Sequence, residues 1–262
     1  MTKDLSDMSA IPSLAAARRK SRLYVELAST VDDIRASQAL RYRVFAGEMG
    51  AEVKGGSGLD EDLFDAYCHH LLVKETATGK VIASTRLLLG EQARKAGSFY
   101  SQSEFDMDAL YDLPGRSVEV GRTCVDPNFR QGAAIAVLWS GLADFIKQFE
   151  ISHLFGCASI EMDDGGVVAQ AIMNNVRQHA MSDAQWRVTP KHPLPPLPAG
   201  TETVVSAPLP PLLKAYFRLG ARACGEPCFD PAFNCADILV LVDVEKMDSS
   251  YTRHFLDRVS KE

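Results

Sequence analysis

The segment that decides the fold is Val118-Glu-Val-Gly-Arg-Thr-Cys-Val-Asp-Pro-Asn-Phe-Arg-Gln-Gly-Ala-Ala134, which joins a strand pattern to a glycine-containing turn and a helix start. Residues 117–125 predict a central strand that ends at Asp126-Pro127. From Ala133 to Phe149, apolar residues recur at helical spacing and predict an amphipathic helix packed on the sheet. A strand, a turn and a helix amino terminus bring free backbone N–H groups to a sheet edge. Such groups suit a phosphate or a developing oxyanion.

Two charged residues, Glu119 and Arg122, lie in this strand. On a regular strand, residues three positions apart face opposite sides of the sheet. Gly121 lies between them, and a glycine inside a strand often marks a bulge. We therefore predict a bulge between Glu119 and Arg122 that brings both side chains to one face. The alternative is a structural ion pair beside the sheet with no part in chemistry.

Around this segment the chain predicts one mixed α/β domain, residues 23–262, after a flexible N-terminal arm, residues 1–22. Thr30 and Asp33 resemble a capping arrangement for a first helix that reaches about Met49. Helices are expected on both faces of a mixed sheet. The remaining expected elements are strands at 23–27, 70–74, 81–89, 153–158 and 236–244, helices at 166–179, 212–223 and 249–259, and a proline-rich insertion at 186–211.

Charge and composition exclude several classes of protein. A net charge of -6 and a pI near 5.6 argue against a nucleic-acid partner. The amino terminus lacks the basic-then-apolar order of a signal peptide, and the longest apolar run, 238–242, is far below the roughly 20 residues that span a bilayer. We expect a cytoplasmic protein, with peripheral membrane contact left open. The six cysteines lack CxxC spacing, so we expect reduced thiols and no metal; a site at Cys224, Cys228 and Cys235 is the alternative.

Several blocks occur together in a family-specific order. They are Leu40-Arg-Tyr-Arg-Val-Phe45, 60–65, Cys68-His-His-Leu-Leu-Val73, Ser84-Thr-Arg-Leu87, Glu119-Val-Gly-Arg122, Gly220-Ala-Arg-Ala-Cys-Gly-Glu-Pro227 and Phe233-Asn-Cys-Ala-Asp237. From about residue 23 to the carboxyl end, the chain resembles the GNAT superfamily. Within it, the chain is similar to the ornithine N-acyltransferases and hemolysin-like N-acyl amino acid synthases, relatives of the acyl-homoserine-lactone synthases. The resemblance implies a GNAT-like acyl-CoA N-acyltransferase fold with a bulged central strand.

The resemblance also implies the reaction. It implies that a (3-hydroxy) fatty acyl group passes from an acyl carrier protein to the α-amine of L-ornithine, giving lyso-ornithine lipid. It implies no permanently bound cofactor. The segment 130–134 carries only part of the Q/R-x-x-G-x-G/A pattern that binds acetyl-CoA, which favours a carrier protein donor. Expected donor-binding residues are Cys124, Val125, Arg130, Gly132, Ala133 and Ala134. An acidic carrier needs a basic patch, for which Arg18, Arg19, Lys20 and Arg22 are candidates; mobile terminal charges are an equal alternative.

The expected catalytic residues are Glu119 and Arg122. An amino acid α-amine is protonated at neutral pH, so it needs a base before it attacks a thioester, and Glu119 is the candidate, directly or through water. Burial and Arg122 would shift the pKa of Glu119 in opposite directions. Backbone N–H groups near 123–125 are expected to stabilise the oxyanion. Expected substrate-binding residues are Arg41, Phe45, Asp60, Asp62, Asp65 and Arg86.

Other interpretations stay open at this point. The three loop aspartates could grip the ornithine ammonium, or could pair with Arg41, Arg43 or Arg86 to hold the first helix and the loop over the site. The acceptor could be another amino acid. An autoinducer-type synthase that uses S-adenosylmethionine and a non-enzymatic hemolysin-like binding protein are the competing functions.

Overall fold

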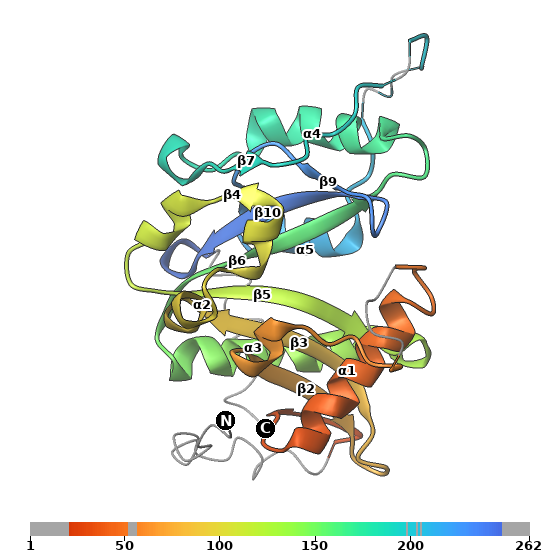
Figure 1. Ribbon diagram of the computed structural model, residues 1–262, viewed down its shortest axis with the longest axis vertical. Coiled ribbons are helices and arrows are strands. Elements are labelled where there is room, and N and C mark those ends of the chain that lie inside the picture. The colour runs from red at the N-terminus through yellow and green to blue at the C-terminus, as the bar shows by residue number, and fades with distance from the viewer. Residues whose placement is uncertain (1–20, 52–56, 198, 203, 205, 248–262) are drawn as a thin grey trace.

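The computed structural model describes residues 21–51, 57–197, 199–202, 204 and 206–247. Within them, eight strands form one mixed sheet in the order β1-β2-β3-β5-β6-β10-β8, and β9 also pairs with β10 (Figure 1). The strands are β1 (Leu23–Leu27), β2 (His69–Glu75), β3 (Val81–Leu89), β5 (Arg116–Val125), β6 (Ile151–Glu161), β8 (Arg222–Ala223), β9 (Cys228–Asp230) and β10 (Cys235–Asp243). Only β5 and β6 pair in parallel, which confirms the mixed α/β sheet.

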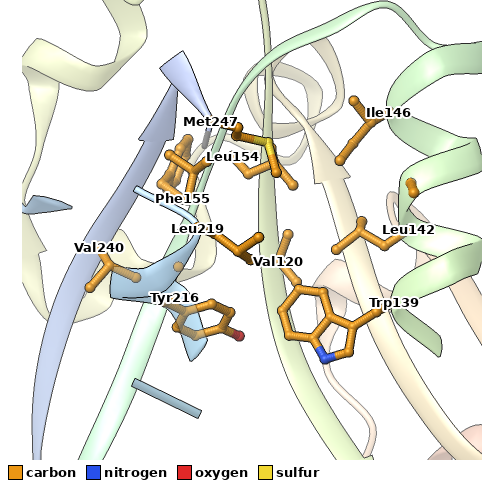
Figure 2. Close-up of a pocket in the computed structure, with 13 residues that line it drawn as sticks. Val120, Trp139, Leu142, Ile146, Leu154, Phe155, Tyr216, Leu219, Val240 and Met247 are labelled. Atoms are coloured by element: carbon orange, nitrogen blue, oxygen red, sulfur yellow. The ribbon is translucent and has the colours of Figure 1, made fainter. Parts of the chain in front are cut away.

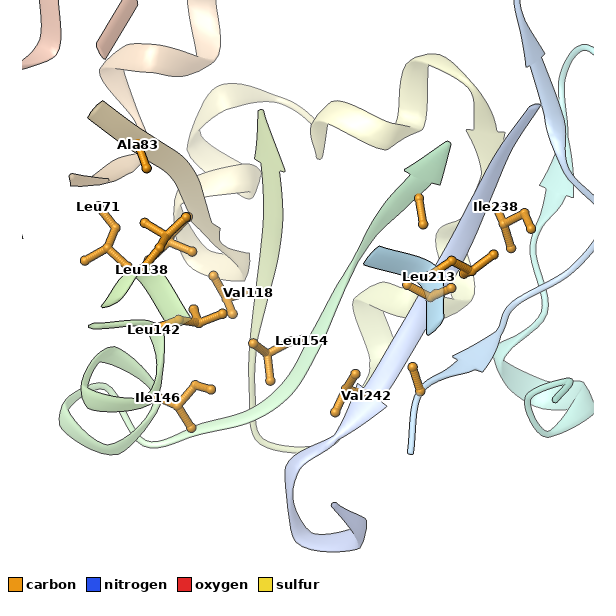
Figure 3. Packing of buried hydrophobic residues seen from close by; sticks show 14 of the residues in the cluster. Leu71, Ala83, Val118, Leu138, Leu142, Ile146, Leu154, Leu213, Ile238 and Val242 are labelled. Atoms are coloured by element: carbon orange, nitrogen blue, oxygen red, sulfur yellow. The ribbon is translucent and has the colours of Figure 1, made fainter. Parts of the chain in front are cut away.

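Helices cover both faces of this sheet. One face carries α3 (Ala133–Gln148), α4 (Val167–His179) and α5 (Pro211–Arg218), and the other carries α1 (Val31–Phe45) and α2 (Gly90–Ala96). Figure 3 shows Leu138, Leu142 and Ile146 of α3 packed toward the large apolar cluster of the first face. Neighbouring residues of β2 alternate between the two cores, because Leu71 belongs to the α3 side and Leu72 to the α1 side.

Short elements connect these layers. Four-residue 3-10 turns, η2 (Leu63–Ala66) and η3 (Tyr100–Ser103), lie on the α1 face. The remaining ones are η4 (Asp108–Asp112), η5 (Pro127–Phe129), η6 (Ala184–Trp186) and η7 (Val244–Lys246). A second sheet pairs β4 (Phe105–Asp106) with β7 (Thr189–Pro190), so the start of the proline-rich stretch is tied to the domain. None of the helices in the described ranges has the length and apolarity to cross a membrane.

The predicted helix starts agree with the structure better than the predicted ends. Thr30 caps α1 by accepting a hydrogen bond from the Asp33 N–H at 3.1 Å, as predicted. The helix ends at Phe45, however, rather than near Met49. The helix predicted for 212–223 is also too long, because Gly220 takes a φ of 95° and the chain turns into β8. The predicted helix 249–259 and residues 1–20 of the arm lie outside the described residues.

The centre of the sheet is irregular in two places. First, Ser84 pairs with Cys124 while Arg86 pairs with Gly121, so Thr85 alone faces two residues of β5. This bulge lies at Arg122 and Thr123, just past the predicted position, and Arg122 itself adopts a φ of 51°.

The second irregularity is a divergence of β5 from β6. These strands pair only as far as Glu119 and Phe155, although β5 continues to Val125 and β6 to Glu161. Gly156 marks the last close approach, because a Cβ there would lie 2.2 Å from the Val120 carbonyl oxygen. Beyond it, no strand among the described residues pairs with this edge of β5.

Candidate active site

Three aspartates of the loop before β2 are bound by two buried arginines on the α1 face. Arg41 of α1 donates to Asp60 and Asp65, and Arg86 of β3 donates to Asp62 and Asp65, at N–O distances of 2.6 to 3.1 Å. Burial alone would raise the pKa of Asp65, but hydrogen bonds and charge from Arg41, with Arg86, hold it well below its usual range. The loop carboxylates are therefore structural partners of the arginines.

This network changes two of the expected substrate contacts. The side chains of Arg41 and Arg86 are 0% and 4% exposed, so a substrate has little access to either. Of the two interpretations of the acidic loop, the structure shows ion pairs that hold α1 and the loop together. Arg43, one of the arginines considered for these pairs, is exposed on α1 and takes no part.

Glu119 is buried and already hydrogen-bonded. Its side chain lies on the α1 face, where Oε2 accepts from the Tyr100 N–H at 2.7 Å, and Oε1 accepts from the Ser101 N–H and Oγ at 2.7 and 2.6 Å. Burial raises the pKa of Glu119, and the hydrogen bonds from Ser101 and Tyr100 oppose this rise. The amino-terminal turn of η3 thus donates to both oxygens, and the predicted role as base requires the amine or a water to reach a glutamate that is 3% exposed.

Arg122 lies on the same face as Glu119, as predicted, because both contact Tyr100. The guanidinium carbon is 4.9 Å from the Tyr100 ring centre and 5.6 Å from the rings of Phe45 and Phe233. Asp60 is its ion-pair partner at 3.6 Å. Phe45, expected to touch substrate, thus contacts the arginine.

A second acidic group, which the sequence interpretation did not assign, continues from Glu119 across β6 to β10. Ser101 Oγ is 3.3 Å from the Cys157 sulfur, which lies 3.5 Å from Glu104 Oε2. Burial and the nearby Asp237 charge raise the pKa of Glu104 to about 8. Asp237 in turn accepts from Ser159 Oγ at 2.5 Å. Neither Glu104 nor Asp237 forms an ion pair with an arginine or lysine in the part of the chain that the structure describes.

The residues of this acidic group were hard to identify from the sequence. Asp237 belongs to the Phe233-Asn-Cys-Ala-Asp237 block, which indicated the family but did not indicate a function for this residue. Glu104 lies in a polar stretch with no periodicity, and nothing in that stretch indicates that it folds over β6. Only the three-dimensional pairing of β6 with β10 brings Ser159 opposite Asp237.

An apolar pocket opens on the other face of the sheet, where β5 and β6 diverge. Figure 2 shows Val120 of β5 facing side chains of α3, including Trp139, and of α5, including Tyr216. The pocket holds about 660 Å³ of space between side chains, counting the part open to solvent. Its lining is almost wholly apolar: Val120, Trp139, Leu142, Ala143, Ile146, Leu154, Phe155, Gly156, Tyr216, Leu219, Val240, Val242 and Met247. The first of these lining residues, Val120, directly follows Glu119 in β5.

The expected donor-binding residues divide into accessible and buried ones. Gly132 and Ala133 are exposed at the amino terminus of α3, which has no side-chain cap. Arg130 is exposed but paired with Glu48 at 2.7 Å. Cys124 and Ala134 are buried in the core, so their side chains cannot contact a donor; Val125 is half-buried and its carbonyl accepts from Arg130.

The cysteines bear on the metal and redox expectations. All six are free thiols, and burial raises the pKa of several of them, to about 12 for Cys68 and Cys224. One group in the described residues has metal-ligand geometry, Asp230, Cys235 and Asp237, whose ligand atoms lie within 4.8 Å of one another. It differs from the cysteine cluster considered from the sequence.

The mixed sheet, the diverging central strands and the apolar pocket between them define a GNAT-type acyltransferase. Residues 40–140 match the family model described as an acetyltransferase (GNAT) domain. Among solved structures, the chain is similar to the CoA-dependent acyl-homoserine lactone synthase BjaI, with SAM and isopentyl-CoA, at a TM-score of 0.55 and 15% identity over 91% of this chain and 89% of that one. It is also similar to the AHL synthase LasI, at a TM-score of 0.52 and 12% identity over 90% and 96%.

More similar sequences narrow the class. The chain is 34% identical to an L-ornithine N(alpha)-acyltransferase of Brucella abortus over 255 residues, 90% of each chain. It is 33% identical to the protein of that name in Rhizobium meliloti, over 94% of this chain and 88% of the relative. A Rhodobacter capsulatus protein of the same name is 33% identical over 90% and 95%. The chain belongs to the L-ornithine N(alpha)-acyltransferase family and is an acyltransferase.

Proposed function

We propose that the protein transfers a fatty acyl group, such as a 3-hydroxyacyl group, from an acyl carrier protein to the α-amine of L-ornithine, giving lyso-ornithine lipid. The relatives named L-ornithine N(alpha)-acyltransferase support the acceptor. The observation that carries the proposal is the apolar pocket at the divergence of β5 and β6. A fatty acyl chain needs such a lining, since burial of its methylene groups contributes about 0.8 kcal/mol each.

The pocket and Glu119 lie on opposite faces of β5, next to the point where β5 and β6 diverge. Val120 faces the pocket, while Glu119 faces η3. A thioester held at this divergence would place its acyl chain in the pocket and its carbonyl at the unpaired edge of β5. Backbone N–H groups along that edge would then stabilise the oxyanion formed when the amine attacks.

Proton transfer needs a rearrangement at Glu119. The α-ammonium must lose a proton before its nitrogen forms the bond to the acyl carbon; the carbon–sulfur bond then breaks, and the thiolate takes the second proton, which the acylated nitrogen gives up. Glu119 is buried and already accepts three hydrogen bonds from η3, so it can act as base only if the amine or a water reaches its remaining lone pair or replaces one of these donors. In its present state Glu119 positions η3 and, through it, Tyr100.

Donor recognition is proposed for the carboxyl end of β5 and the amino terminus of α3. Gly132 and Ala133 present uncapped backbone N–H groups there, which favour an anion such as the phosphate of phosphopantetheine. The incomplete CoA-binding pattern supports a carrier protein donor over free CoA. Of the proposed basic docking residues, Arg22 is described and its side chain is 80% exposed.

An amine screen tests the proposal. Purified protein is mixed with a 3-hydroxyacyl carrier protein and, separately, with ornithine, lysine, glycine or S-adenosylmethionine, and free thiol is followed. We expect thiol release to depend on ornithine, with N-acylornithine detected by mass spectrometry. Equal release with every amine, or a lactone product from S-adenosylmethionine, would reject the ornithine assignment. Replacing the acyl carrier protein by the corresponding CoA thioester tests the donor. We expect the CoA thioester to react far more slowly than the acyl carrier protein.

A further inference from the structure

A guanidinium without a hydrogen-bond acceptor lies at the bulge of β5. Among the described residues, the charged neighbour of Arg122 is Asp60, and the 3.6 Å between Nε and Oδ2 is too long for a hydrogen bond. The Nε atom is buried and finds no hydrogen-bond partner in the part of the chain that the structure describes. Arg41 and Arg86, by contrast, use their donors on the loop carboxylates.

The surroundings of Arg122 hold its charge without satisfying its donors. The rings of Tyr100, Phe45 and Phe233 lie within 4.9 to 5.6 Å of the guanidinium carbon, close enough for cation–π attraction. Aromatic rings offer no strong acceptor to the in-plane N–H groups of a guanidinium. The side chain is therefore fixed in position, with donors left over for a ligand.

The backbone and exposure of Arg122 also set it apart from its neighbours. Its φ of 51° is in the left-handed region, which is unfavourable for a residue other than glycine. Its side chain is 18% exposed, against 0% for Arg41 and 4% for Arg86. It is the arginine of this cluster that solvent and small molecules can reach.

We infer that Arg122 binds the carboxylate of the amino acid acceptor, which makes an α-amino acid, rather than a simple amine, the ligand class of this site. A planar guanidinium and a carboxylate form two parallel hydrogen bonds, and the unsatisfied Nε donor suits such a ligand. The inference rests on the proposed function. In an α-amino acid the α-amine is one carbon from the carboxylate, so this contact also selects the α-amine over an amine at the far end of the side chain.

The test compares ornithine with ornithinamide, in which the carboxylate is neutralised, and with 1,4-diaminobutane, in which it is missing. For the native protein we expect kcat/KM to be about 10- to 100-fold higher for ornithine, as for other charge-assisted hydrogen bonds. Arg122→Gln should lower kcat/KM for ornithine by a much larger factor than that for ornithinamide, so that the preference for ornithine is lost. Arg122→Lys keeps the charge but not the paired donors, and should be intermediate. Arg43→Gln, on the exposed side of α1, is the matched control and should keep the full preference.

Each other outcome has a distinct meaning. Equal kcat/KM for ornithine and ornithinamide in the native protein overturns the inference while leaving acyl transfer intact. A rise in KM for the acyl donor in Arg122→Gln, with the ornithine preference unchanged, assigns the arginine to the donor and also overturns it. Acylation of none of the three amines rejects the proposed function itself. Because the native comparison needs no variant, the test stands even where Arg122→Gln folds poorly.

Discussion

At the scale of single residues, the partners of a charged side chain decide what it can do. Arg41, Arg86 and Arg122 lie on one face of the sheet, yet Arg41 and Arg86 are bonded to aspartates, whereas Nε of Arg122 has no acceptor among the described residues. The sequence blocks predicted that these residues gather at a site. The sequence blocks could not show which arginine pairs with the loop aspartates, because these carboxylates lie next to α1 and β3 only in the folded protein.

The raised pKa of Glu104 predicts an unusual pH dependence of the free energy of unfolding. Its pKa is raised from 4.5 to about 8, so the folded protein keeps a proton that the unfolded chain releases between these values. Stability from this group is therefore lost as the pH rises from about 5 to about 8. Glu104→Gln should flatten that slope in thermal unfolding followed by circular dichroism. Glu61→Gln, an exposed control, should retain the native slope, and a Glu104→Gln slope equal to the native one would contradict the assignment.

The two roles considered for Glu119 predict different results. If it is the base, Glu119→Gln should lower kcat by about 10² to 10⁴, and Ser101→Ala, which keeps the Ser101 N–H contact, should cost much less. If it only holds η3, both variants should lose activity in proportion to their loss of thermal stability. Parallel measurement of kcat and Tm decides between them. The native kcat/KM profile should also show an acidic limb above the usual glutamate range, because burial raises this pKa.

At the scale of elements, the divergence of β5 from β6 is the feature on which the proposed site depends. The central strand and the helix after it were predicted from periodicity, and both were found. The bulge was predicted from Gly121 but lies at Arg122 and Thr123. A glycine indicates that a strand can deviate, whereas the register of the neighbouring strand, here β3, decides where it does.

Gly156 should be essential for this arrangement. A Cβ at this position would meet the Val120 carbonyl oxygen at 2.2 Å, and backbone cannot move away as a flexible side chain can. Gly156→Ala should therefore destabilise the protein by about 1–3 kcal/mol, as overpacking does elsewhere. Gly121→Ala is the matched control on β5, with no atom within 4 Å, and should be neutral or slightly stabilising. Urea unfolding of the two variants measures the difference, and equal stabilities would show that the strands do not meet there.

At the scale of the whole molecule, the sheet separates two chemistries. Charged and hydrogen-bonded groups gather on the α1 face. The apolar pocket lies on the α3 face (Figure 2). Helices were predicted on both faces of the sheet, and the order of sequence blocks indicated the family. The pocket was not predictable, since its lining comes from α3, α5 and three strands that are distant in sequence.

The claim that this pocket holds the fatty acyl chain is tested most directly by the chain-length preference of a pocket variant. Ala143 lines the pocket from α3, whereas Ala136 is exposed on the same helix. Kinetics with acyl carrier proteins of increasing chain length should show that Ala143→Phe keeps activity with short chains and loses it with long ones. Ala136→Phe should behave like the native protein. An unchanged preference in Ala143→Phe, with short-chain activity intact, would contradict the assignment of the pocket.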